Sequence, residues 1–284
     1  MTDGDLTGWI GRSRTTRDTI SAGQLAKIAA TFDCPAPASD KTASLPPGWH
    51  WAFFPDITPL SGIGRDGHQA LGEFLPPVPL PRRMWASGNL KINRPLGIGE
   101  TVDKTSTILS VEEKQGRTGH LVFVRVGHEF SGNRGGSMQE EHQIVYREAP
   151  DPDAVPPPPM LPPHEPDRSV TLTASPVQLF RYSAITFNSH RIHYDVDFCR
   201  DEEGYDGLII HGPLTATLLM ELACSQAPGR LLKSFSFRAL SPLTHVHQFS
   251  LHVFETAEKH YSVWACNHRG ELAMTGEAEL GPDQ

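Results

Sequence analysis

Side chains that can move or direct protons lie close together in the second half of the chain. Asn188 and His193 are five residues apart with His190 between them, and His211-Gly212 follows just before an apolar stretch with helical spacing. An imidazole takes up and returns protons near neutral pH. The first turn of a helix offers unpaired N–H groups and the positive end of the helix dipole, which suit a negatively charged oxygen. Residues of these types could carry out proton transfer next to an oxyanion site.

A glycine at position 212 suits an oxyanion site for a separate physical reason. A glycine at the start of a helix lets a substrate come close to the backbone N–H groups. We therefore expect Gly212 to donate to the oxyanion and His211 to contact the substrate, although His211 is equally well explained as a residue that packs at the start of the helix.

The run from Tyr182 to Asp195, together with the later His-Gly step, resembles the active-site segment of the MaoC-like (R)-specific enoyl-thioester hydratases, which have a hotdog fold. In that family the segment reads Asp-x-Asn-x-x-His, and His-Gly opens the central helix. The family Asp and His share the work on water and protons, and the Gly amide binds the thioester oxygen. The resemblance implies hydration of an enoyl thioester, or the reverse dehydration, without a metal or a redox cofactor and with coenzyme A only as part of the substrate.

The match has no gap, but it departs from the family at two positions, and the loss of the Asp matters most for proton transfer. His193 stands at the family His, His190 at the family Asn, and Asn188 at the family Asp. An amide does not exchange a proton as a carboxyl group does. Our hypothesis is that His193 is the general base and also returns the proton, that Asn188 holds the water, and that His190 is the reserve candidate for the second proton transfer.

The first half carries motifs that resemble the N-terminal hotdog of the type 2 hydroxyacyl-thioester dehydratases, and within that branch the chain is most similar to the mesaconyl-C4-CoA (3-methylfumaryl-CoA) hydratases. No Asn-x(4)-His segment and no His-Gly helix start occur in this half, so we expect it to shape the pocket for the acyl group and coenzyme A without catalysing the reaction. The motifs are Gly64-Arg65-Asp66-Gly67-His68, Phe74 to Trp85, Arg94-Pro95-Leu96 and Val145-Tyr146-Arg147.

Several arginines are candidates for contact with coenzyme A phosphates or with a substrate carboxylate. Arg82 and Arg83 lie beside an aromatic residue and a Pro-rich stretch, and Arg191 lies inside the aligned segment. Solvation at the surface or an internal ion pair is the alternative explanation for each of them.

These residues must be positioned by two similar sets of elements. A helix capped by Ser21 precedes four predicted strands in the first half, and a helix that starts at Ser175-Pro176, a second one over 213–226 and five strands make up the second half. Alternating apolar and polar residues in several strands predict antiparallel sheets with one buried face. The predicted strands are Gly88–Asn93, Thr101–Glu112, His120–Phe130, Met138–Arg147, Val170–Thr173, Leu231–Ala239, Val246–Glu255, Tyr261–Asn267 and Glu271–Leu280.

A proline-rich segment divides the chain. Nine prolines fall between Pro150 and Pro166, a composition that favours extended polyproline II and excludes a packed helix or an inner strand. We predict an N-terminal half over 1–149, a linker over 150–168 and a catalytic C-terminal half over 169–284. The pattern alone indicates an α+β fold. The resemblance implies a double hotdog, two fused halves in which a sheet wraps a central helix.

Composition excludes several classes of protein. The 284 residues carry a formal net charge of −8, which argues against a nucleic-acid partner. No apolar run of about 18 residues is present and the N-terminus lacks the pattern of a signal peptide, so we expect neither membrane insertion nor export. The four scattered cysteines are typical of a cytoplasmic protein with reduced thiols.

Other functions are compatible with the same residues. His190, His193, Asp195 and His211 are an alternative metal site, although no supporting Cys or HExxH pattern exists. A general 3-hydroxyacyl-thioester dehydratase acting on CoA or carrier-protein substrates is the nearest alternative activity. A non-catalytic acyl-CoA-binding hotdog, in which Asn188 marks a lost activity, and a thioesterase are further ones. We expect the acyl-CoA substrate to be the main partner, with a homodimer or larger assembly of the double hotdog as an additional possibility.

Overall fold

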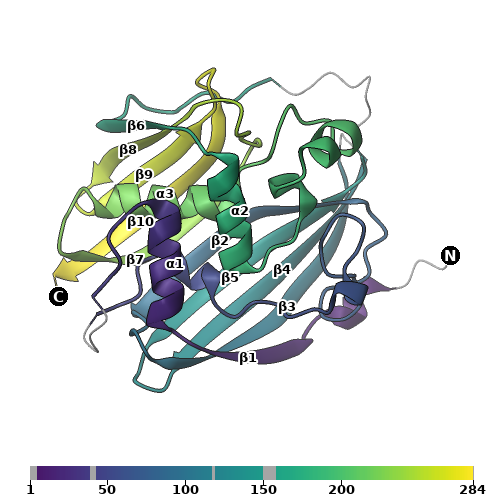
Figure 1. Cartoon of the computed structure of the whole chain (residues 1–284), viewed down its shortest axis with the longest axis horizontal. Helices are drawn as coiled ribbons and strands as arrows, with labels where there is room; N and C mark the ends of the chain where they lie inside the picture. Colours follow the sequence, from purple (N-terminus) through teal and green to yellow (C-terminus); the bar gives the residue numbers. More distant parts are fainter. Residues whose placement is uncertain (1–4, 39–42, 117–118, 150–157, 284) are drawn as a thin grey trace.

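One antiparallel sheet of ten strands runs through the whole molecule (Figure 1). The computed structural model describes residues 5–38, 43–116, 119–149 and 158–283. The strands are β1 (Ser13–Thr19), β2 (Arg82–Arg94), β3 (Thr101–Gly116), β4 (Gly119–Gly132), β5 (Ser137–Arg147), β6 (Arg168–Leu172), β7 (Arg230–Ala239), β8 (Phe249–Ala257), β9 (His260–Cys266) and β10 (Leu272–Asp283).

The strand order repeats in the two halves of the chain. The sheet runs β1-β3-β4-β5-β2-β7-β10-β9-β8-β6, so each half contributes five neighbouring strands in the same internal order, counted outward from the centre. The halves join where β2 pairs with β7, from Ser87 opposite Arg238 to Lys91 opposite Ser234. The two halves therefore share one hydrogen-bonded sheet.

Three α-helices lie on one face of this sheet (Figure 1): α1 (Ala22–Phe32), α2 (Pro176–Thr186) and α3 (Gly212–Cys224). The hydroxyls of Ser21 and Ser175 accept the N-cap hydrogen bonds of the first two helices, as predicted. Helix α3 packs across β7, β8, β9 and β10, and its apolar residues are buried in the main core. Shorter helical turns are η1 (Leu6–Trp9), η2 (Trp49–Ala52), η3 (Leu60–Gly62), η4 (Arg191–His193) and η5 (Phe198–Glu202).

The architecture is the predicted α+β double hotdog, but the first half is built differently from the second. The main contacts of α1 are with α2 and η2, whereas α3 lies along its own strands. Aromatic residues from the segment before β2 fill the first half: Trp49, Phe53 and Phe54 are buried in the core, and Phe54 meets Phe130 of β4 edge to face. A sheet wrapped around a central helix was expected in each half. Helix α3 has this place in the second half, and α1 lies on the same face of the sheet in the first half.

Strand β1 and the linker are the two regions for which the sequence patterns predicted least. Strand β1 was not predicted, because its residues Ser13–Thr19 are polar or charged and none of them is buried. Residues 150–157 of the predicted linker lie outside the described residues, and residues 158–167 contain neither helix nor strand. The carbonyl of Met160 accepts a hydrogen bond from Leu272 of β10. The domain boundaries stay a prediction.

Two further expectations concern the chain as a whole. None of the helices in the described residues combines the length and the apolar character needed to cross a membrane. All four cysteines are free thiols.

Candidate active site

The imidazole of His193 is buried and held in one tautomer. The ring lies at the end of η4 with only 7% of the residue exposed, and its Nδ1 is 2.8 Å from the carbonyl oxygen of Ile209. A carbonyl can only accept, so Nδ1 carries the proton and Nε2 holds the free lone pair in the neutral ring. Burial lowers the pKa of His193 to about 4, although the hydrogen bond to Ile209 raises it. His193 is therefore neutral, in its base form, at physiological pH.

His193 lies against the start of helix α3. Its ring stacks on His211 with centroids 3.6 Å apart, and His211 precedes the first helical residue, Gly212. His211 is only 1% exposed and its Nε2 is 2.8 Å from the hydroxyl of Ser183. This environment makes His211 a packing residue beneath the base, and substrate contact by His211 stays a prediction.

The packing around residue 212 also favours glycine over a residue with a side chain. A Cβ added there would lie 3.1 Å from Cε3 of Trp85, which comes from β2 in the other half. The backbone N–H of Gly212 has no hydrogen-bond partner among the described residues. Helix α3 thus begins with a free donor close to His193, which is the arrangement expected of an oxyanion site.

Asn188 shapes the turn that leads to the base. Its Oδ1 accepts a hydrogen bond from the backbone N–H of His190, and its own N–H donates to the carbonyl of Ser183. The residue also lines a cavity of about 690 Å³, a size typical of small-molecule sites. Because Oδ1 is used in the turn, the amide NH2 is the part of the side chain free to orient a water or a carbonyl oxygen.

A loop from the first half docks onto this segment. The backbone N–H of Arg191 donates to the carbonyl of Asp66, and the ring of His68 lies 3.8 Å from that of His190. Gly67 has φ +87°, and a Cβ there would lie 1.8 Å from the carbonyl oxygen of Ser189. The backbones of the two segments are therefore in direct contact, and the Gly64–His68 motif of the first half forms part of the site.

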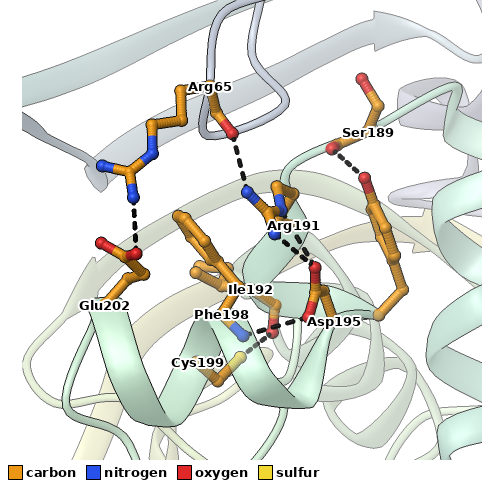
Figure 2. Close-up of polar contacts among 9 residues, drawn as sticks. Arg65, Ser189, Arg191, Ile192, Asp195, Phe198, Cys199 and Glu202 are labelled. Atoms are coloured by element: carbon orange, nitrogen blue, oxygen red, sulfur yellow. Dashed lines mark hydrogen bonds and ion pairs between the residues drawn. The ribbon is translucent and has the colours of Figure 1, made fainter.

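The side chain of Arg191 also stabilises the contact between this segment and the loop of the first half (Figure 2). Its Nε and Nη2 donate to Oδ2 of Asp195 at 3.0 and 2.7 Å, and its Nη1 donates to the carbonyl of Arg65 at 3.3 Å. Its guanidinium also lies 4.2 Å from the ring of Phe198. Arg191 is thus engaged within the protein and does not line the 690 Å³ cavity.

The two neighbouring arginines of β2 differ in their surroundings. Arg82 forms an ion pair with Glu203, in which each side chain is only 15% exposed, and donates to the carbonyl of Glu202. Arg83 lines the cavity and has no carboxylate partner among the described residues. Of the two, Arg83 is the one available to a substrate anion.

The metal site considered from the sequence is not assembled. Asp195 is bound to Arg191, and Nδ1 of His193 and Nε2 of His211 are hydrogen bonded to Ile209 and Ser183. Among the described residues, a different group has ligand atoms within 4.8 Å of one another: Asp66, His68 and His190. Asp66 and His68 were not predicted as site residues, although they belong to the Gly64–His68 motif of the first half.

The chain is similar along its length to characterised families of thioester hydro-lyases. A family model described as hydroxyacyl-thioester dehydratase type 2 matches residues 48–245. A mesaconyl-C(4)-CoA hydratase of Chloroflexus aurantiacus is 40% identical over 281 residues, which are 99% of this chain and 100% of the relative. A mitochondrial hydroxyacyl-thioester dehydratase type 2 of Schizosaccharomyces pombe is 27% identical over 80% of this chain and 85% of its own length.

Solved structures support the fold. A MaoC-like dehydratase from Phytophthora capsici superimposes with a TM-score of 0.69 at 16% identity over 100% of both chains. HtdX from Mycobacterium tuberculosis gives a TM-score of 0.67 at 19% identity, covering 93% of this chain and 98% of its own. At these identities the likeness concerns the fold, and it agrees with the double hotdog described above. Since the family model covers more than half of the chain and the Chloroflexus relative matches nearly all of it, the chain belongs to the hydroxyacyl-thioester dehydratase type 2 family.

Proposed function

We propose that this protein is a carbon–oxygen hydro-lyase that hydrates mesaconyl-C4-CoA (3-methylfumaryl-CoA) to citramalyl-CoA and catalyses the reverse dehydration. The full-length similarity to a mesaconyl-C(4)-CoA hydratase supports the substrate. The observation in the structure that carries the reaction class is His193: a buried, neutral imidazole with a fixed tautomer, stacked on the residue that precedes the free N–H of Gly212.

Each residue has a defined part in the addition of water. Nε2 of His193 takes a proton from a water molecule that the side-chain amide of Asn188 orients. The water oxygen bonds to C3 of the enoyl group, and the C2–C3 π electrons move toward the thioester oxygen. The N–H of Gly212, at the positive end of α3, stabilises the charge on that oxygen. The reaction ends when C2 receives a proton.

Arg83 is the residue we assign to the free carboxylate of the substrate. In mesaconyl-C4-CoA this carboxylate is attached to C3, the carbon that receives the hydroxyl, so its partner must lie close to the reacting atoms. Burial is the largest cause that lowers the pKa values of His68 and His190, and the charge of Arg83 also lowers both, so Arg83 lies close to these two rings. A guanidinium without a carboxylate partner at this place is suited to bind a substrate carboxylate.

The cavity has the features needed to admit a long anionic thioester. Arg83 and Lys104 contribute positive charge to its wall, and Leu60, Phe180 and Phe187 line it with apolar side chains that are more than half exposed. Exposed apolar side chains of this size commonly mark binding grooves. The proposed reaction needs no metal and no redox cofactor. A cytoplasmic location and assembly into a homodimer or larger oligomer stay predictions from the sequence.

The test follows the loss of enoyl-thioester absorbance with mesaconyl-C4-CoA and crotonyl-CoA in parallel. We expect the wild type to prefer the dicarboxylic substrate and His193→Ala to lose at least about 10²-fold in kcat. Arg83→Gln should lose about 10- to 100-fold in kcat/KM with mesaconyl-C4-CoA and little with crotonyl-CoA, because a charge-assisted hydrogen bond contributes about 1.5–3 kcal/mol. Arg125→Gln, an exposed position of β4 outside the cavity, is the matched control.

Each alternative function has its own outcome in this experiment. Equal or faster turnover of crotonyl-CoA would favour a general dehydratase of 3-hydroxyacyl thioesters, the activity named in the yeast relative. Binding of acyl-CoA without turnover would indicate a non-catalytic binding protein. Release of free coenzyme A thiol would indicate a thioesterase.

A further inference from the structure

The first half of the chain brings an Asp–His pair to the catalytic segment of the second half. Oδ2 of Asp66 is 2.7 Å from Nδ1 of His68, and Oδ1 of the same carboxylate accepts the backbone N–H of His68. The carboxylate therefore holds both the ring and the backbone of His68. With Nδ1 donating to Asp66, Nε2 is the atom of His68 left for a substrate.

This pair lies where the site lacks a group. Hydration needs a donor for C2 besides the base that activates water, and Asn188, at the position where related segments carry Asp, has no proton to transfer. His68 lines the same cavity as Asn188. We propose that His68, oriented by Asp66, is the second proton-transfer group of the hydratase, so that the active site is built from both halves of the chain. This assignment rests on the hydratase function proposed above.

His190 lies between the two imidazoles. Its ring centroid is 3.8 Å from that of His68 and 5.6 Å from that of His193. Burial, the largest cause, and the charges of the neighbouring imidazoles together lower the pKa of His190 to about 2. Because the ring lies between the other two and can accept a proton at one nitrogen while releasing one from the other, we assign His190 this relay.

The proton balance of the step is complete. In hydration, Nε2 of His193 receives one proton from water as the hydroxyl bonds to C3. The electron pair of the resulting enolate then forms the C2–H bond with the proton that Nε2 of protonated His68 gives up. His193 then holds one extra proton and His68 lacks one. Transfer over His190 restores both. In dehydration the same atoms act in reverse, with neutral His68 removing the C2 proton and Asp66 stabilising the imidazolium that forms.

The groups around His68 define how its protonation responds to substitution. Burial is the largest influence and lowers its pKa, the charge of Arg83 lowers it further, and the hydrogen bond and charge of Asp66 raise it. His190 is the other titratable group stacked against the ring. Removing the Asp66 carboxylate must therefore lower the pKa of His68, which makes Asp66 a positioning residue with a measurable signature.

The experiment compares His68→Gln, His68→Ala and Asp66→Asn with His120→Gln, a half-buried histidine of β4 outside the cavity that serves as the control. Hydration of mesaconyl-C4-CoA is measured in H2O and D2O, with thermal unfolding of every variant to verify folding. We expect His68→Gln to lower kcat about 10²- to 10³-fold with little change in KM and to slow deuterium incorporation at C2. Imidazole added to His68→Ala should restore part of the rate. Asp66→Asn should move the alkaline limb of the hydration profile to lower pH, since protonated His68 is required.

Different failures point to different conclusions. If His68→Gln and its alanine counterpart keep wild-type kcat while His193→Ala is inactive, the assignment of His68 is overturned and the hydratase function stands. If the wild type does not turn over the enoyl-CoA, the proposed function is overturned and this assignment with it. Loss of activity on dialysis against EDTA, with recovery on adding Zn²⁺, would replace proton transfer by a metal site at Asp66, His68 and His190.

Discussion

A single glycine sets the approach of the two halves at the active site. Gly67 has φ +87°, a conformation that is costly for other residues, and the position of its missing Cβ is occupied by the carbonyl oxygen of Ser189. The hydroxyl of Ser189 in turn donates to the carbonyl of Gly67. Without this close contact His68 would not reach His190. The placement of one catalytic candidate thus depends on the absence of a side chain one residue away.

Substitution of this glycine tests that dependence. Gly67→Ala should lower the free energy of unfolding by more than the roughly 1–3 kcal/mol of backbone strain, because the added methyl group also collides with Ser189. Gly72→Ala is the matched control, since Gly72 also has a positive φ but its Cβ would meet only Pro77 at 3.8 Å. Urea unfolding and hydratase assays measure both effects. Equal stability of the two variants would show that the contact between residues 67 and 189 relaxes readily.

At the scale of elements, strand β5 carries a buried carboxylate under the site. Glu140 is 3% exposed and is contacted by Nε1 of Trp51 at 2.8 Å, Nε2 of His142 at 2.7 Å and Nε2 of His50 at 3.3 Å. Burial raises the pKa of Glu140, but the charges of His142 and His50 outweigh it and hold the pKa well below the usual value. Because Trp51 also packs against Trp85, which covers Gly212, the network on β5 supports the helix start from below.

Removal of this carboxylate should be costly. Glu140→Ala leaves buried donors without a partner, and we expect a loss of about 3–5 kcal/mol in the free energy of unfolding. Glu141→Ala on the same strand removes only a half-exposed pair with Arg125 at 3.9 Å and should change stability by less than about 0.5 kcal/mol. Chemical denaturation compares the two variants. A small effect of Glu140→Ala would mean that apolar packing replaces the network.

At the scale of the whole molecule, the halves are joined by a continuous sheet and by buried imidazoles at their boundary. Burial is the main cause that lowers the pKa values of His68, His190, His193 and His211. These side chains come from both halves, so the buried cluster exists only when the complete double hotdog has formed. The energetic consequence is that folding and histidine protonation are coupled.

That coupling predicts the pH dependence of stability. In the unfolded chain these histidines titrate near pH 6.5, whereas the folded pKa values are lower, about 4 for His193 and about 2 for His190. At pH values between the folded and the unfolded pKa, the unfolded state binds more protons than the folded state. The contribution of these histidines to the free energy of unfolding is therefore full above about pH 6.5 and is lost as the pH decreases toward 4. Urea midpoints at pH 7.5, 6 and 5 should decrease in that order. A flat profile, or an equal slope in His193→Gln, would contradict the prediction.

Local signals account for the elements that were predicted correctly. The caps at Ser21 and Ser175 and the alternation in β7 and β8 depend on neighbours a few residues away, so they are readable in the sequence. Strand β1 escaped prediction because no apolar face marks it, and its pairing with β3 depends on residues about 90 positions away. The burial of Trp49, Phe53 and Phe54 in the core of the first half was likewise not visible in local patterns.

The sequence by itself determined the family and the reaction class, and it predicted the segment from Asn188 to His193, because the resemblance depends on residue types at short, fixed spacing. Only the tertiary structure decided which other groups meet that segment. It engages Arg191 with Asp195, leaves Arg83 in the cavity wall, and brings His68 against His190 from more than 100 residues away. No periodicity or local propensity encodes such a contact, since it arises from the packing of backbones that become neighbours only when the shared sheet has formed.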